Sequence, residues 1–121
     1  MFAPVFDILQ SDADVTSIIG NPPRAFDFGE VVGQDVARPY VVFQTISGNP
    51  YNALDCPPDT DLDSIQIDSY ATNKAGAKDL SIAVRKALEA SSYMISGPRV
   101  QHEEETRLFR VSMDFDFHTV R

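Results

Sequence analysis

Hydrophobic and polar residues alternate most regularly near the C-terminal end of the sequence. From Phe109 to His118 every second residue is apolar, and the residues between them are polar or charged. A period of two residues is typical of a β-strand that buries one face. The segment Ser64–Ala71 alternates in the same way, with Ile65 and Ile67 on one side. These two segments therefore predict strands of a half-buried sheet.

The segment after Ala71 has the period of an amphipathic helix. Thr72 or Asn73 can supply the N-cap oxygen, and from Ala77 onward the apolar residues fall on one helical face. Gly76 costs about 1 kcal/mol relative to alanine inside a helix, so this helix depends on docking against a sheet. We predict that it is the main helix of the domain. Its apolar face consists of Ala77, Leu80, Val84, Ala87 and Leu88.

The first 20 residues contain two short apolar stripes that meet near Ser11. Ser11 or Asp12 can cap the second of two helical segments. Gly20 is placed where a helix commonly ends, and the Pro22-Pro23 pair that follows cannot continue a helix. We therefore expect a short N-terminal helical arm with a break near Ser11.

Two further segments favour strands. Residues 24–28 alternate briefly and indicate an edge strand, whereas residues 29–38 contain two glycines and indicate a loop. Residues 39–47 are rich in β-branched and aromatic residues, which are enriched in strands. Tyr40–Phe43 are apolar on both faces, so this strand is covered on both sides by its own domain, or on one side by a partner.

Residues 48–62 interrupt the pattern with prolines, asparagines and acidic residues, and indicate a solvated excursion between two strands. Residues 91–98 are expected to turn the chain around after the main helix, and residues 99–105 lead into the last strand. Together the segments predict an α+β fold. We expect a mostly antiparallel β-sheet of four to five strands, one main helix packed on a face, and the N-terminal helical arm. No repeat or linker divides the chain, so residues 1–121 are expected to form a single domain.

Charge and cysteine content narrow the functional classes. The net charge is −8, which disfavours binding to nucleic acid through phosphate neutralisation and disfavours an anionic membrane surface. Cys56 is the single cysteine, so an internal disulfide is impossible, and a reducing, intracellular site of synthesis is expected. The N-terminus lacks the pattern of a signal peptide, and no apolar run is long enough for a membrane span.

The sequence offers little catalytic chemistry. The acidic residues 59–63 lack the glycine and the glutamate that a calcium loop of the EF-hand type needs, so no metal site is predicted. His102 stands beside glutamates whose side chains alternate in direction along a β segment, and His118 lies on the polar face of the last strand. Neither a nucleophile elbow nor a phosphate-binding glycine loop is present. We predict that the protein is not an enzyme and needs no cofactor.

The order and spacing of five features nevertheless resemble a known family, the tail-completion (tail-terminator) proteins of long-tailed phages and related prophage elements. The resemblance covers roughly residues 3–118. The features are, in order, a short N-terminal helix closing at Ile18–Gly20, Pro39–Phe43 with Ser47 and Gly48, Leu54 and Asp55 in the following loop, Ile65–Ala71 leading into Ala83–Leu88, and Arg110–Phe115.

The resemblance implies a small structural virion protein made in the host cytoplasm. Such proteins form rings, typically homohexamers, at the head-proximal end of the tail tube. The ring ends tube polymerisation and contacts the tail tube protein and the head connector or stopper protein, and DNA passes through its lumen without specific binding. The family has no catalytic residues, and no membrane is involved.

The expected contacts with neighbouring subunits are surplus β surface and the 48–62 loop. A disordered hairpin loop without such a role is an equal alternative for residues 48–62. The candidate interface residues are Tyr40, Val42, Asn49, Tyr51, Leu54, Asp55, Phe109 and Phe115.

Other functions fit parts of the same pattern. The nearest alternative is another head–tail connector, adaptor or tail-tube component of the same virion. A second class is an acidic enzyme or small-molecule binding domain, which would use His102, His118 and nearby carboxylates. A third is an acidic mimic of DNA, which only the net charge suggests.

Overall fold

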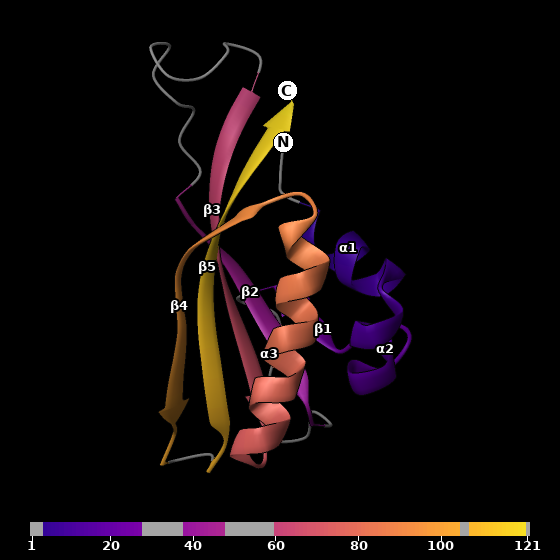
Figure 1. Cartoon of the computed structure of the whole chain (residues 1–121), viewed down its shortest axis with the longest axis vertical. Coiled ribbons are helices and arrows are strands. Elements are labelled where there is room, and N and C mark those ends of the chain that lie inside the picture. Colours follow the sequence, from indigo (N-terminus) through magenta and orange to yellow (C-terminus); the bar gives the residue numbers. More distant parts are fainter. Residues whose placement is uncertain (1–3, 28–37, 48–59, 105–106, 121) are drawn as a thin grey trace.

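The computed structural model describes residues 4–27, 38–47, 60–104 and 107–120, which form three helices and five strands. Figure 1 shows the three helices gathered on one side of a tall, twisted sheet. The elements are α1 (Val5–Ser11), α2 (Ala13–Ile19), β1 (Ala25–Asp27), β2 (Tyr40–Ser47), β3 (Thr60–Ala71), α3 (Lys74–Glu89), β4 (Tyr93–His102) and β5 (Phe109–Val120). The predicted α+β class, with one main helix on a mostly antiparallel sheet, is confirmed.

The strands lie in the order β1-β2-β3-β5-β4, so the two long strands β3 and β5 occupy the middle of the sheet. Every pairing is antiparallel except that of β1 with β2, which is parallel. Directly paired residues share a face of the sheet, as Ile67 and Met113 do. The alternation in the sequence therefore places apolar side chains on the face of the sheet that the helices cover, the helix face. The alternate side chains lie on the opposite face, the open face.

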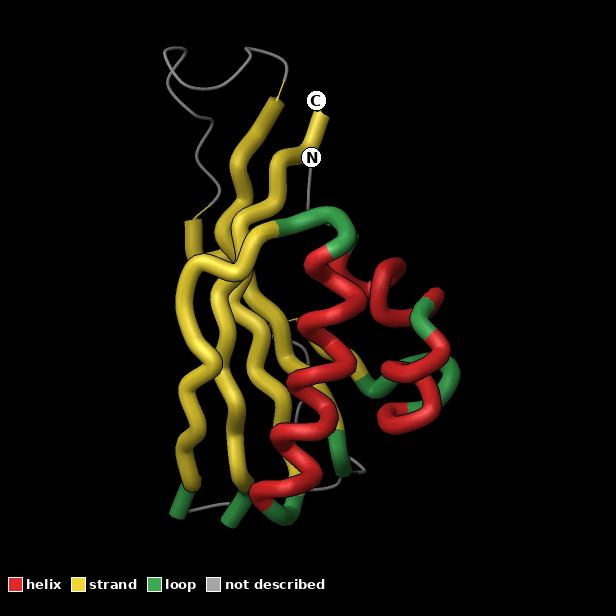
Figure 2. Tube along the Cα trace, viewed as in Figure 1, coloured by secondary structure: helices red, strands yellow, loops and turns green. Residues whose placement is uncertain are grey.

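The helix face is the hydrophobic core. Side chains of α1, α2 and α3 meet those of β2, β3 and β5 there in one cluster. Figure 2 shows α1 and α2 beside α3 at the β1 end of the sheet. Fully buried residues of this cluster include Leu9, Ile19, Val41, Ile67, Leu80, Leu88, Met113 and Phe115.

The helix ends follow the predicted caps. Asp12 separates α1 from α2, and its side chain accepts a hydrogen bond from the backbone N–H of Val15 at 3.0 Å. Asn73 caps α3 by accepting from the N–H of Gly76 at 2.6 Å. Both contacts satisfy amide groups that a helix N-terminus leaves without an intrahelical partner. None of the helices in the described ranges is long and apolar enough to cross a membrane.

The structure corrects the prediction between α3 and β5. The expected turn at residues 91–98 is wrong, because β4 begins at Tyr93 and pairs with β5. The register shifts twice, between Met94 and Ser96 and between Ser96 and Arg99, and these irregularities accommodate Gly97. Gly97 has a φ of +98°, which suits glycine better than any other residue. The strand β3 also begins at Thr60, inside the segment expected to be a loop.

Candidate functional site

A carboxylate lies at the centre of the open face. Asp68 on β3 is only 7% exposed although no described helix packs on this side of the sheet. It accepts a hydrogen bond from the Ser112 hydroxyl on β5 at 2.6 Å, and the Gln66 amide donates to both of its oxygens at 3.2 Å. A buried charge persists when hydrogen bonds replace its lost hydration. Asp68 therefore ties the two central strands together through polar contacts.

A row of aromatic rings crosses the same face from β1 to β3. Phe26 meets Tyr40 edge-on, with ring centroids 6.3 Å apart, and Tyr40 stacks on Tyr70 at 4.9 Å with an angle of 17° between the rings. Burial raises the pKa of both phenols above its ordinary value, and a hydrogen bond between Arg110 and Tyr70 partly opposes the shift at Tyr70. Both tyrosines stay protonated at neutral pH, so the row carries no charge.

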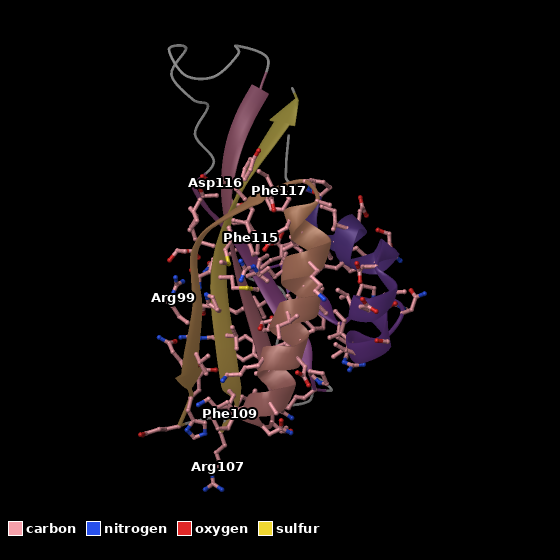
Figure 3. The ribbon with its side chains drawn as sticks, in the orientation of Figure 1. Arg99, Arg107, Phe109, Phe115, Asp116 and Phe117 are labelled. Atoms are coloured by element: carbon pink, nitrogen blue, oxygen red, sulfur yellow. The ribbon has the colours of Figure 1, made fainter. Side chains whose placement is uncertain are left out.

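Arginines continue the open face towards β4. Arg110 lies next to Tyr70 at the end of the aromatic row and donates a hydrogen bond to the Gln101 side chain on β4. Its guanidinium lies 4.0 Å from the Glu103 carboxylate. Arg99 on β4 lies 3.4 Å from both carboxylate oxygens of Asp114. Figure 3 shows Arg99 at the β4 side of the sheet. The open face is thus polar, and its arginines and acids are largely paired with each other.

Three of the five large apolar side chains that are exposed in the described ranges lie on β4, an outermost strand of the sheet. No strand in the described ranges pairs with its outer edge, because β4 ends the strand order. Tyr93 is 72% exposed, Ile95 54% and Val100 40%. Two hollows of about 320 and 400 Å³ lie where α3 meets β4, and Glu89, Ser92 and Tyr93 line both. An open strand edge with exposed apolar side chains is a ready surface for another protein chain.

Another exposed apolar residue lies on the outward side of α3. Ile82 is 53% exposed, and Lys78, Arg85 and Lys86 stand within one helical turn of it. Arg85 also pairs with Glu89 one turn further on. In the described ranges no three His, Cys, Asp or Glu side chains are grouped to hold a metal ion.

The predicted interface residues fall into three groups. Tyr40 and Val42 lie on the open face, where Tyr40 is buried by its own stacking and Val42 is half-buried. Phe109, the first residue of β5, is half-buried and packs beside His102, with ring centroids 4.6 Å apart. Phe115, labelled on the upper part of β5 in Figure 3, is 0% exposed in the core.

Phe115 therefore offers no surface to a neighbour. It was predicted as an interface residue because the sequence does not show which face of the last strand the helices cover. The candidates Asn49, Tyr51, Leu54 and Asp55 lie outside the described residues. The predicted interface residues do not include Tyr93, Ile95, Val100 or Ile82. Ile82 carried a usable signal, because it interrupts the otherwise charged outer stripe of the main helix. The β4 residues carried none, because their strand was not predicted.

These features define a class of protein. A small sheet is covered by helices on one face, keeps a polar open face on the other and exposes apolar residues at one edge, as expected of a building block in an assembly. Residues 3–119 match the family described as tail completion protein gp17, so the chain belongs to this family. It is a structural tail component that joins tail and head in a virion, so the predicted family and the predicted head–tail joining role are confirmed.

Solved structures of other proteins share the fold, and two of them illustrate the likeness. A chain from the virion of a native gene transfer agent (GTA) particle superposes with a TM-score of 0.73 at 19% identity, over 97% of this chain and 92% of that one. The gp17 protein of bacteriophage SPP1 superposes with a TM-score of 0.57 at 16% identity, over 97% of this chain and 86% of that one. A search of the curated proteins found no match.

Proposed function

We propose that copies of this chain close into a ring, a homohexamer, on the head-proximal end of the tail tube. The ring ends polymerisation of the tube protein and presents its other side to the head connector or stopper protein. DNA passes through the lumen without specific binding. The observation that carries this proposal is the edge of β4, which no described strand pairs with and where Tyr93, Ile95 and Val100 are exposed, in a chain of the tail completion family.

The sheet has two unlike edges, which allows a head-to-tail contact between subunits. Its two edges differ, because β4 spans Tyr93–His102 whereas β1 at the opposite edge spans only Ala25–Asp27. Contacts between unlike surfaces repeat head to tail and close when the rotation between subunits allows it. A closed ring has no free end in its own plane, which suits a protein that stops growth.

Charge supports the passage of DNA. The net charge of −8 gives every subunit a repulsive field towards phosphates, whereas a basic lining would bind DNA and slow its movement. The remaining interface candidates of this proposal are Val42 and Phe109, together with Asn49, Tyr51, Leu54 and Asp55 of the 48–62 loop. The absence of a catalytic role is also part of the proposal and fits a family of structural tail proteins.

Electron microscopy of particles made without this gene tests the role. Tails much longer than those of the parent, with no heads attached, are expected, because nothing stops the tube protein. Restoring the gene in trans should restore tail length. Tails of normal length beside heads that lose DNA would contradict termination and would favour the alternative, another connector or adaptor of the same virion.

A further inference from the structure

All three lysines of this acidic chain lie on α3: Lys74, Lys78 and Lys86. Lys78 and Lys86 stand one turn before and one turn after the exposed Ile82, on the side of the helix that faces away from the sheet. In the described part of the molecule neither lysine forms an ion pair, whereas Arg85 beside them pairs with Glu89. We call Lys78, Ile82, Arg85 and Lys86 the α3 stripe.

A complementary surface lies on the N-terminal arm. The helices α1 and α2 contain acidic residues but no lysine or arginine. Asp7 and Asp14 are exposed, and neither forms an ion pair with the described residues. Ile18 follows Asp14 by one turn and is half-buried, so an acid and an apolar side chain share this surface. The spacing of Asp14 and Ile18 equals that of Ile82 and Lys86.

We propose that the α3 stripe of one subunit binds the α1–α2 arm of a second copy of this chain. This inference rests on the proposed ring and names one pair of surfaces that builds it. The stripe and the arm are different patches of the same subunit, as head-to-tail contacts require. Ile82 packs against the half-buried Ile18 of the arm, and the lysines face Asp7 and Asp14. Opposite potentials on the two patches set the partner and the register.

Charge reversal in two sets tests the contact. One variant carries Lys78→Glu and Lys86→Glu, and the other carries Asp7→Lys and Asp14→Lys. Each variant alone places like charges across every interface, so each is expected to lower the yield of tails of normal length at least about tenfold in cells lacking the original gene. A chain with all four changes should restore the yield to within about threefold of the parent.

Expressing the two double variants together gives the sharpest outcome. In a ring that alternates them, every interface again joins opposite charges, so co-expression should restore assembly that neither variant supports alone. Lys74→Glu is the matched control, because the same charge change lies eight residues and about 12 Å of helix rise away from Ile82. It should assemble like the parent. A second probe, Ile82→Asp, should abolish assembly while the purified chain unfolds as cooperatively as the parent.

Other outcomes overturn the inference. If the lysine variant fails while the aspartate variant works normally, the α3 stripe binds an acidic surface of a different protein. If neither the fourfold variant nor co-expression restores tails, the two patches do not meet. These results differ from failure of the proposed function, in which deletion of the gene leaves tail length unchanged.

Discussion

Single residues on the open face are held by side chains of the strands themselves. Tyr40 and Tyr70 stack on each other, and Asp68 is enclosed by hydrogen bonds from Ser112 and Gln66. The sequence shows that these residues alternate with the core but not which polar partners lie opposite them. That information comes from the register of β3 with β2 and β5, which places Tyr40 opposite Tyr70 and Asp68 opposite Ser112, residues far apart in the sequence.

Alkaline pH is expected to destabilise the protein through Tyr40 and Tyr70. Burial raises their pKa in the folded state above the ordinary value of 10.0, so the folded chain holds these protons more tightly than the unfolded chain. Their contribution to stability is complete below pH 10 and is lost as the pH rises through the folded-state values. Urea unfolding followed across this range, with Tyr70→Phe as the control that removes one of the two contributions, measures the effect. An unchanged pH dependence in Tyr70→Phe would contradict the assignment.

Replacing Asp68 with alanine is expected to lower the free energy of unfolding by about 2 kcal/mol. The change leaves the buried Ser112 hydroxyl and the Gln66 amide without their acceptor, and hydrogen bonds to charged groups contribute about 1.5–3 kcal/mol. Asp114→Ala is the matched control on the neighbouring strand. Its carboxylate pairs with a partly exposed arginine at 3.4 Å, so its loss should cost less than about 1 kcal/mol. Equal losses in the two variants, measured by urea unfolding, would refute the buried network.

At the level of elements, the sequence predicts what local periodicity encodes. Both central strands, the main helix and the break in the N-terminal arm follow from their apolar spacing and caps. The strand β4 could not be predicted in this way, because almost all of its residues are exposed and Gly97 interrupts it. It forms because β5 offers a free edge for pairing. The parallel pairing of β1 with β2 is equally non-local.

Gly97 should be the least replaceable position in β4. A Cβ at this residue would lie 2.6 Å from the Ser112 carbonyl oxygen and 3.1 Å from the Met113 Cα, and its φ of +98° disfavours any side chain. Both contacts are with backbone of the central strand β5, so neither can move aside easily. We expect Gly97→Ala to destabilise the fold by about 2 kcal/mol or more. Thermal unfolding measures this, and a melting temperature equal to that of the parent would show that the bulge can be rebuilt.

For the molecule as a whole, the candidate site is harder to predict than the fold. The fold depends on buried residues that the sequence marks by period, whereas an assembly surface depends on what the fold leaves uncovered. Phe115 and Tyr93 illustrate the difference: the first is apolar and lies in the core, and the second is apolar and protrudes at an edge. Period alone does not separate them, because the answer depends on where the helices pack.

A positive charge on the β4 edge should therefore block assembly and spare the fold. Ile95 is 54% exposed, so Ile95→Lys should change the free energy of unfolding by less than about 0.5 kcal/mol. On the proposed ring, the same lysine enters an apolar contact at every interface and is expected to prevent normal tails, because charged edge residues are the common device against edge-to-edge pairing. Ile95→Val is the matched control, because it keeps an apolar, β-branched side chain at the same exposed position of β4. Tail lengths measured by electron microscopy in cells carrying each variant decide the matter. Normal tails with Ile95→Lys, or equal defects in both variants, would remove the β4 edge from the assembly.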